Sequence, residues 1–151
     1  MIDVRLRAVL EADLPVFYEW RRDPEAVERS KLPPKDRDAF LTQWRTEVLP
    51  NSEGIVRAIT ADGVLAGNIL SFPFNGRRCI GYWLDRAFWG RGVGTAALRL
   101  FLTEVDSARP IYAETDEGNA GSLRMLEKCG FARVGVEVDG DIRFIVLRLD
   151  D

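Results

Sequence analysis

The chain has 151 residues and a formal net charge of −3, with 46% hydrophobic and 30% charged residues. This composition is that of a folded, water-soluble protein, and it excludes disorder along the whole chain. The negative charge gives no general attraction to nucleic acid or to an anionic membrane, so we expect neither as a partner.

Residue types that are rare or absent narrow the chemistry further. The chain has no histidine, which excludes His-dependent triads and imidazole metal ligands. Cys79 and Cys129 lack the spacing of a zinc site or a disulfide framework, so we expect no metal and a reducing compartment. No apolar run reaches the length of a secretory signal or a membrane span. We therefore expect one domain over residues 1–151, in the cytoplasm, as a monomer or a homodimer.

The first third of the chain predicts one strand and two helices. Ile2, Val4 and Leu6 alternate with polar residues, as in a half-buried strand. Apolar residues at helical spacing predict a helix over 12–21 and a second amphipathic helix over 36–48. The segment Leu32-Pro33-Pro34-Lys35 separates the two helices, because its prolines interrupt regular structure.

Three strands and a helix are expected next. Segments 54–60 and 64–72 are joined by Asp62-Gly63, a strong signal for a hairpin turn. A further strand is expected over 78–84. Beyond a glycine-rich loop, apolar residues recur at helical spacing and predict a helix with one buried face.

The last part of the chain predicts a strand, a helix and a final hairpin, over 111–115, 119–128, and 131–138 with 142–149. Gly130 can end the helix in a left-handed conformation, and Asp139-Gly140 is a second hairpin signal. Helical crossovers and hairpins in this order predict a mixed α/β sheet.

Three glycines, Gly90, Gly92 and Gly94, lie between a predicted strand and a predicted helix. Without Cβ atoms the backbone can curl and direct successive N–H groups, together with the helix N-terminus, at one anion. Arg91 can add charge-assisted contacts to a diphosphate. The loop can also serve only as a tight turn, and both interpretations stay open.

Two other phosphate-binding patterns fit less well. Residues 92–97 match G-x-G-x-x-A, with Glu114 as a ribose-binding acid, but that pattern opens a parallel βαβ array and here a hairpin follows. A mononucleotide P-loop fails because no Gly-Lys-Ser/Thr follows the glycines.

Three segments of the chain resemble the GNAT superfamily of N-acetyltransferases, in particular its branch similar to RimJ and RimL. The matching strings are RLR, DL and WRRDP in 5–24, IGYWL and FWGRGVGT in 80–95, and NAGSLRMLEKCGF in 119–131. The order and separation of the last two make the resemblance specific.

This resemblance implies a single-domain α/β fold with a mixed, mostly antiparallel sheet of about seven strands and about four helices. The sheet is splayed at a central parallel pair, and the cleft there binds acetyl-CoA as cosubstrate. The strand end at Trp83, Leu84 and Asp85 is expected to pair with the pantetheine amides. The other expected cofactor contacts are Trp89, Gly90, Arg91, Gly92, Val93, Gly94, Thr95, Asn119, Ser122, Met125 and Lys128. Trp89 departs from the family pattern, since many members have Gln or Arg there.

The resemblance also implies roles in catalysis. Glu114 is the expected base, because it ends the strand that forms the other wall of the cleft and stands five positions before Asn119, as in RimI-like relatives. A solvated strand-end carboxylate is the alternative. At the position of Leu126, many acyltransferases carry a tyrosine that protonates the departing thiolate. Here Ser122 or Tyr82 is expected to protonate the departing thiolate, unless the thiolate leaves unprotonated.

The sequence thus predicts an acyltransferase that moves an acetyl group from acetyl-CoA by direct attack of a primary amine, on a protein N-terminus or a small molecule. The alternative is a catalytically silent acyl-CoA-binding sensor or interaction module, which the missing tyrosine permits.

Overall fold

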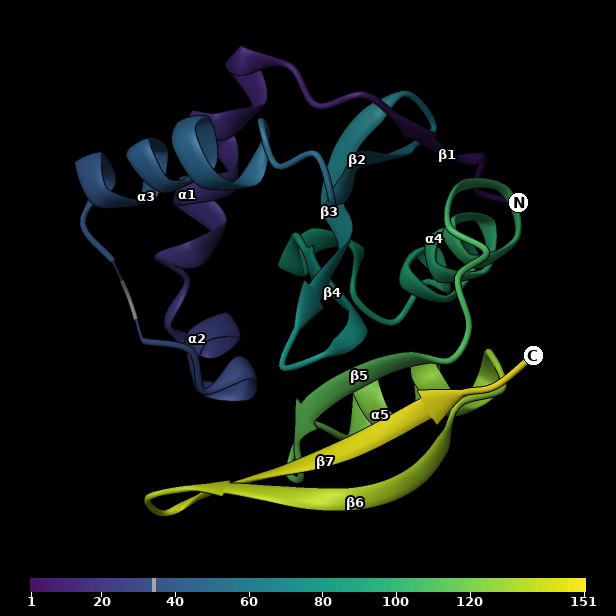
Figure 1. Cartoon of the computed structure of the whole chain (residues 1–151). Coiled ribbons are helices and arrows are strands. Elements are labelled where there is room, and N and C mark those ends of the chain that lie inside the picture. Colours follow the sequence, from purple (N-terminus) through teal and green to yellow (C-terminus); the bar gives the residue numbers. More distant parts are fainter. Residues whose placement is uncertain (34) are drawn as a thin grey trace.

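A seven-stranded sheet forms the centre of the molecule, with strand order β1-β2-β3-β4-β5-β7-β6 (Figure 1). The computed structural model describes residues 1–33 and 35–151, so the part of the predicted break that falls on Pro34 lies outside the described residues. Neighbouring strands pair antiparallel except β4 and β5, which are parallel. The predicted α/β fold, a mostly antiparallel sheet with a central parallel pair, is therefore confirmed.

The strands lie close to their predicted positions. Their bounds are β1 Val4–Arg7, β2 Ile55–Ala61, β3 Val64–Phe74, β4 Arg77–Leu84, β5 Ile111–Asp116, β6 Ala132–Asp139 and β7 Ile142–Leu149. Both predicted hairpin turns are present, with φ of 50° at Asp62 and 80° at Gly63, and 60° at Gly140. These left-handed values explain why Asp-Gly pairs occupy the turns.

The helices differ from the prediction mainly at α2. Their bounds are α1 Leu14–Arg21, α2 Pro24–Ser30, α3 Arg37–Gln43, α4 Val93–Leu100 and α5 Ala120–Lys128. The sequence analysis did not predict α2, although its start carries two clear signals. Pro24 stands in the first turn, and the Asp23 carboxylate accepts a hydrogen bond from the Glu25 N–H at 3.2 Å. The predicted helix over 36–48 is α3, continued by a π-helical turn over Trp44–Val48.

The two faces of the sheet are covered by different helices. On one face, α4 and α5 pack against the sheet through Val93, Leu98 and Leu126, which are almost fully buried. On the other face, α1 and α3 pack through Phe17 and Phe40. Figure 1 shows α1, α2 and α3 gathered on one side of the molecule, away from α4 and α5. This division leaves the line between β4 and β5 accessible from two directions.

The parallel pair of strands is joined only briefly. One register pair, Cys79 with Tyr112, connects β4 to β5. Among the described residues no further register pair follows it, although β4 extends another five residues to Leu84 and β5 another four to Asp116. The two strands therefore diverge toward their C-terminal ends, where the glycine-rich loop and α5 begin.

Candidate active site

A cavity of about 530 Å³ lies at the C-terminal end of β4, beside the starts of α4 and α5. The glycine-rich loop, the start of α4, one side of α5, the end of β4 and part of α2 form its walls. Of the residues predicted to bind the cofactor, those that line the cavity are Trp83, Leu84, Trp89, Gly90, Gly92, Val93, Gly94, Thr95, Asn119, Ser122, Met125 and Lys128. Segments far apart in the sequence therefore meet in one place.

The glycine-rich loop leaves open space above its backbone. Gly90 and Gly92 have φ values of 73° and 79°, in the left-handed region that glycine adopts without strain. An added Cβ at either position would meet no atom within 4 Å. Gly92 is also the N-cap residue of α4, so the first free N–H groups of that helix lie beside this space. The loop therefore has the geometry of an anion cradle at a helix N-terminus.

Gly94 brings α4 and α5 close together. A Cβ at Gly94 would lie 2.6 Å from the Met125 sulfur, which is closer than van der Waals contact allows. Any larger residue would push the Met125 side chain aside. The glycine therefore lets the two helices form one continuous wall of the cavity.

The end of β4 uses two of its backbone groups within the protein. The Trp89 indole Nε1–H donates to the Leu84 carbonyl at 3.0 Å, and the Asp85 N–H donates to the Ala66 carbonyl at 2.8 Å. Asp85 does not line the cavity, and its carboxylate caps the next turn by accepting from the Ala87 N–H at 3.3 Å. Trp89, which departs from the family pattern, thus has a structural role in holding the loop against the strand.

Two hydroxyl groups meet across the cleft. The Tyr82 hydroxyl on β4 and the Ser122 hydroxyl on α5 are 2.5 Å apart, and both residues line the cavity. Burial raises the pKa of the Tyr82 phenol well above its usual range, although the hydrogen bond with Ser122 acts in the opposite direction. Tyr82 therefore stays protonated at neutral pH and can donate a proton. Leu126, where the family tyrosine would stand, is fully buried in the core.

Glu114 lies on the opposite face of β5 from the hydroxyl pair. Its side chain is exposed, whereas its neighbours Ala113 and Thr115 are buried, and Ala113 belongs to the core on the α4 and α5 side. Glu114 does not line the cavity and neither does Arg91, which is exposed. Burial, and secondarily the Glu114 charge, raises the pKa of the Cys79 thiol, so the carboxylate lies near the point where β4 and β5 join.

Asn119 caps the start of α5. Its side-chain oxygen accepts a hydrogen bond from the Ser122 N–H at 3.3 Å, which makes Asn119 the N-cap residue. Asn119 also lines the cavity, so its amide group faces the space that the prediction assigns to the cofactor. The structural and functional interpretations of this residue are compatible.

Helix α2, which was not predicted from the sequence, also lines the cavity. Ala26, Arg29 and Ser30 line the cavity on the side opposite to α5. The Arg29 guanidinium lies 4.2 Å from the centre of the Trp89 ring, a cation–π contact that joins α2 to the glycine-rich loop. Arg86 adds ion pairs to Asp23 and Glu25 at 3.2 and 2.8 Å. The Asp-Pro pair at 23–24 signalled the helix, but nothing in the sequence placed it over the cleft.

Among residues 1–33 and 35–151, His, Cys, Asp and Glu form no group that could hold a metal ion. In the same part of the chain, none of the helices is long and apolar enough to cross a membrane.

The fold is a mixed α/β sheet that splays at its parallel pair and carries a glycine-rich anion cradle, and comparison with known proteins identifies its family. A family profile described as an acetyltransferase (GNAT) domain matches residues 3–132. The chain belongs to the GNAT acetyltransferase family.

Two relatives from Bacillus subtilis have similar sequences. YdaF, named as a candidate ribosomal N-acetyltransferase, is 31% identical over 111 residues, which cover 69% of this chain and 60% of YdaF. YjcK, named as a candidate N-acetyltransferase, is 43% identical over 61 residues, which cover 38% of this chain and 33% of YjcK. The chain thus spans less than two thirds of the length of the relatives it matches.

Solved structures share the fold over almost the whole chain. The aminoglycoside acetyltransferase AAC(6')-Ib in complex with coenzyme A has a TM-score of 0.78 at 22% identity, covering 99% of this chain and 95% of that one. RimL, a ribosomal alpha-N-protein acetyltransferase solved with coenzyme A, has a TM-score of 0.80 at 19% identity, covering 97% and 93%. A chimera of the spermidine N-acetyltransferase SpeG from Vibrio cholerae has a TM-score of 0.80 at 14% identity, covering 97% and 95%. These proteins share a fold and are named for three different amine acceptors.

Proposed function

We propose that the protein is an N-acetyltransferase that transfers an acetyl group from acetyl-CoA directly to a primary amine. The observation that carries this proposal is the cavity between the end of β4 and the starts of α4 and α5, because it joins the glycine-rich cradle to the half-buried Tyr82–Ser122 pair. A diphosphate suits the cradle, where N–H groups and the start of α4 favour negative charge. The open space above Gly90 and Gly92 fits such a group.

The pantetheine arm would run from the cradle along Asn119 and Met125 toward the point where the strands part. Its amides would pair with the free backbone groups near Trp83, since the Leu84 carbonyl and the Asp85 N–H already have partners. A backbone N–H at this strand end would also stabilise the oxyanion that forms on the thioester carbonyl. Lys128 and Arg91 add positive charge near the outer end of the site.

The amine must lose a proton before it can attack. For a lysine-like amine with a pKa of about 10.4, deprotonation at pH 7 costs about 4–5 kcal/mol, whereas an α-amino group with a pKa near 8 costs about 1. Glu114 is the proposed base, directly or through water, because it is an exposed carboxylate with no hydrogen-bond partner among the described residues. Its position on the α1–α3 side of β5 implies that the amine approaches from that face.

Transfer then breaks the carbon–sulfur bond and leaves a thiolate. The amine nitrogen forms the new bond to the acetyl carbon, and the thiolate sulfur takes a proton. Tyr82 is the proposed donor because its hydroxyl is protonated at neutral pH and the residue lines the cavity, and Ser122, which hydrogen-bonds to it, relays the proton or donates its own. This pair would perform the role of the tyrosine that Leu126 replaces.

The test compares acetyl-CoA binding, measured by calorimetry, with CoA thiol release over a panel of amines. We expect binding of acetyl-CoA and turnover of at least one amine. Glu114→Gln should lower kcat/KM more for lysine-like amines than for α-amino groups, by about 10²-fold or more, with an unchanged Kd for acetyl-CoA.

Glu117→Gln is the matched control, because Glu117 is also an exposed carboxylate just beyond β5 and pairs with Arg143 at 3.1 Å. Its kinetics should equal those of the wild type. Failure to bind any acyl-CoA contradicts the proposal. Binding without turnover over the whole panel, unchanged in Glu114→Gln, would favour the acyl-CoA-binding sensor.

A further inference from the structure

An arginine from α1 lies against the wall of the cleft. The Arg21 guanidinium carbon is 4.9 Å from the centre of the Trp83 ring and 5.8 Å from that of Phe40. Trp83 lines the cavity, so the guanidinium lies behind this part of its wall, on the α1–α3 side. The two aromatic contacts hold the guanidinium in one orientation.

The Arg21 charge has no acidic partner among the described residues. Its Nη2 donates to the Pro33 carbonyl at 3.1 Å, while its Nε is buried and has no hydrogen-bond partner within residues 1–33 and 35–151. Burial lowers the pKa of Arg21, and no carboxylate acts to raise it. Two arginines nearby in the sequence do have acidic partners: Arg22 pairs with Glu19 at 3.2 Å, and Arg29 pairs with Glu25 at 3.4 Å.

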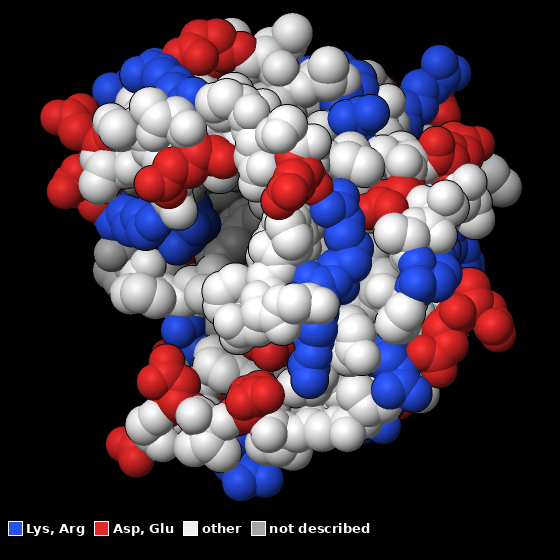
Figure 2. Space-filling model, viewed as in Figure 1, with Lys and Arg blue, Asp and Glu red and all other residues white. Residues whose placement is uncertain are grey.

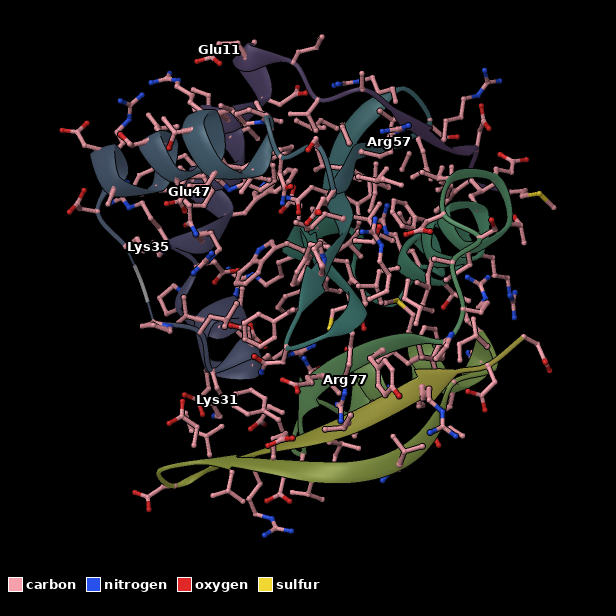
Figure 3. All side chains as sticks on the ribbon, viewed as in Figure 1. Glu11, Lys31, Lys35, Glu47, Arg57 and Arg77 are labelled. Carbon is pink, nitrogen blue, oxygen red and sulfur yellow. The ribbon has the colours of Figure 1, made fainter. Side chains whose placement is uncertain are left out.

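A half-buried guanidinium without a counter-ion is unfavourable, because it has lost part of its hydration and keeps its full charge. A guanidinium carries five N–H donors in a planar fork that matches a carboxylate. In Arg21 the Nη2 group contacts the Pro33 carbonyl and Nε is buried, so the Nη1 donors are the ones left for a ligand. Figure 2 shows a hollow on this face, between α1, α2 and β4, with Lys and Arg side chains on one side of it and Asp and Glu side chains on its upper rim. Lys35 lies on that side (Figure 3), where its amine donates to an uncharged group, Gln43 Oε1. The guanidinium without an acidic partner therefore makes an anion the favoured ligand at this point of the hollow.

We propose that Arg21 binds a carboxylate of the acceptor, so that the preferred acceptors are amines that carry an acidic group close to the amine. This inference rests on the proposed function and names its substrate class. Counted from the pair Cys79–Tyr112, Glu114 is two residues further along β5 and Trp83 four residues further along β4. At about 3.3 Å per residue, the base and the Arg21 stack are offset by about 7 Å along the strands. One acceptor can therefore place its amine near Glu114 and its carboxylate near Arg21.

The same geometry disfavours polycationic acceptors. A second or third ammonium group would enter a site where an unpaired guanidinium already lies, and like charges at close range repel. Proteins of this fold that are named for spermidine or aminoglycosides should therefore lack an unpaired arginine at the position of Arg21.

The experiment measures kcat/KM for pairs of amines that differ in one acidic group. The first pair is two dipeptide amides with N-terminal alanine followed by glutamate or by glutamine. The second pair is free alanine and alaninamide, and spermidine is the polycation. We expect the acidic member of at least one pair to react about tenfold faster or more than its neutral partner. The pair that shows the preference tells whether the carboxylate belongs to an acidic side chain or to a free amino acid.

Variants connect this preference to Arg21. Arg21→Gln should bring the acidic and neutral substrates to within about threefold of each other, with little change for the neutral one. Arg21→Lys keeps the charge and should retain part of the preference. Arg22→Gln, which changes the next arginine, should behave as the wild type.

Several results would overturn the inference. These are a wild-type preference for the neutral amines or for spermidine, or an acidic preference that survives Arg21→Gln in a variant that melts at the wild-type temperature. If Arg21→Gln does not fold, the wild-type comparison alone decides. If acetyl-CoA binds normally and other amines react, but none of the acidic amines does, this inference is wrong while the proposed function stands. If acetyl-CoA does not bind at all, both are wrong.

Discussion

Replacing Tyr82 by phenylalanine tests the hydroxyl pair with almost no change of shape. The ring stays in place, but the 2.5 Å hydrogen bond between the Tyr82 and Ser122 hydroxyl groups is lost. One neutral hydrogen bond contributes about 1 kcal/mol, so the variant should fold and melt a few degrees lower. Acetyl-CoA should bind as before, because the cradle and Asn119 are unchanged.

The effect on catalysis should be larger than the effect on stability. General acid catalysis contributes about 10²–10⁴-fold, and a thiol leaving group with a pKa of about 8.5 needs the lower end of that range. We therefore expect kcat to fall about 100-fold, equivalent to about 2.7 kcal/mol, with little change in KM for acetyl-CoA. Because burial raises the pKa of Tyr82, the wild-type rate should show no loss of an acid between pH 7 and 9.

A double-mutant cycle distinguishes a shared proton path from two separate effects. Ser122→Ala should have a smaller effect than Tyr82→Phe, and the double variant should resemble Tyr82→Phe alone. Tyr112→Phe is the control, since Tyr112 lies on β5 beneath Arg77 and outside the cavity. The reasoning is refuted if Tyr82→Phe retains kcat within threefold of the wild type in the CoA thiol assay.

Two further predictions concern the cradle and the core. Gly92→Ala places a side chain at a φ of 79°, so it should lower the free energy of unfolding by about 1 kcal/mol and weaken acetyl-CoA binding about tenfold. Gly135→Ala, on an exposed strand, should change neither, and equal calorimetric Kd values for the two variants would contradict the prediction. Asp106 accepts from Ser71, Arg78 and the Ala108 N–H at 2.6, 2.9 and 2.9 Å; burial acts to raise its pKa, but these bonds outweigh it and hold the pKa below the usual value. The ionised Asp106 therefore contributes its full stabilisation above about pH 5, and this stabilisation is lost as the pH falls through the lowered pKa. Asp106→Asn should lower the free energy of unfolding by about 3 kcal/mol at pH 7 and flatten the decline in melting temperature between pH 5 and 3. A decline as steep as that of the wild type would count against this role of Asp106.

Local patterns in the sequence were sufficient for most of the secondary structure. The Asp-Gly turns at 62–63 and 139–140 need left-handed backbone that few residues adopt, so they marked two hairpins. α2 was missed because it has only seven residues, too few to show a helical period, although Asp23 and Pro24 signalled its start.

The candidate site was only partly readable in this way. The glycine-rich loop and the Asn119 cap are local motifs, and the structure places both at one cavity. The pairing of Tyr82 with Ser122 depends on two residues forty positions apart, on a strand and a helix that meet only after folding. The same is true of Arg21 on Trp83 and of Arg29 on Trp89.

The sequence by itself determined the order of the elements, the glycine-rich cradle and the family resemblance, because turns, caps and periodicity act over a few neighbouring residues. The tertiary structure alone decided which side chains face the opening between β4 and β5. It separated Glu114 from the hydroxyl pair by putting them on opposite faces of the sheet, and it brought α2 over the cleft. Those relations depend on strand register and helix packing, which no short stretch of sequence encodes.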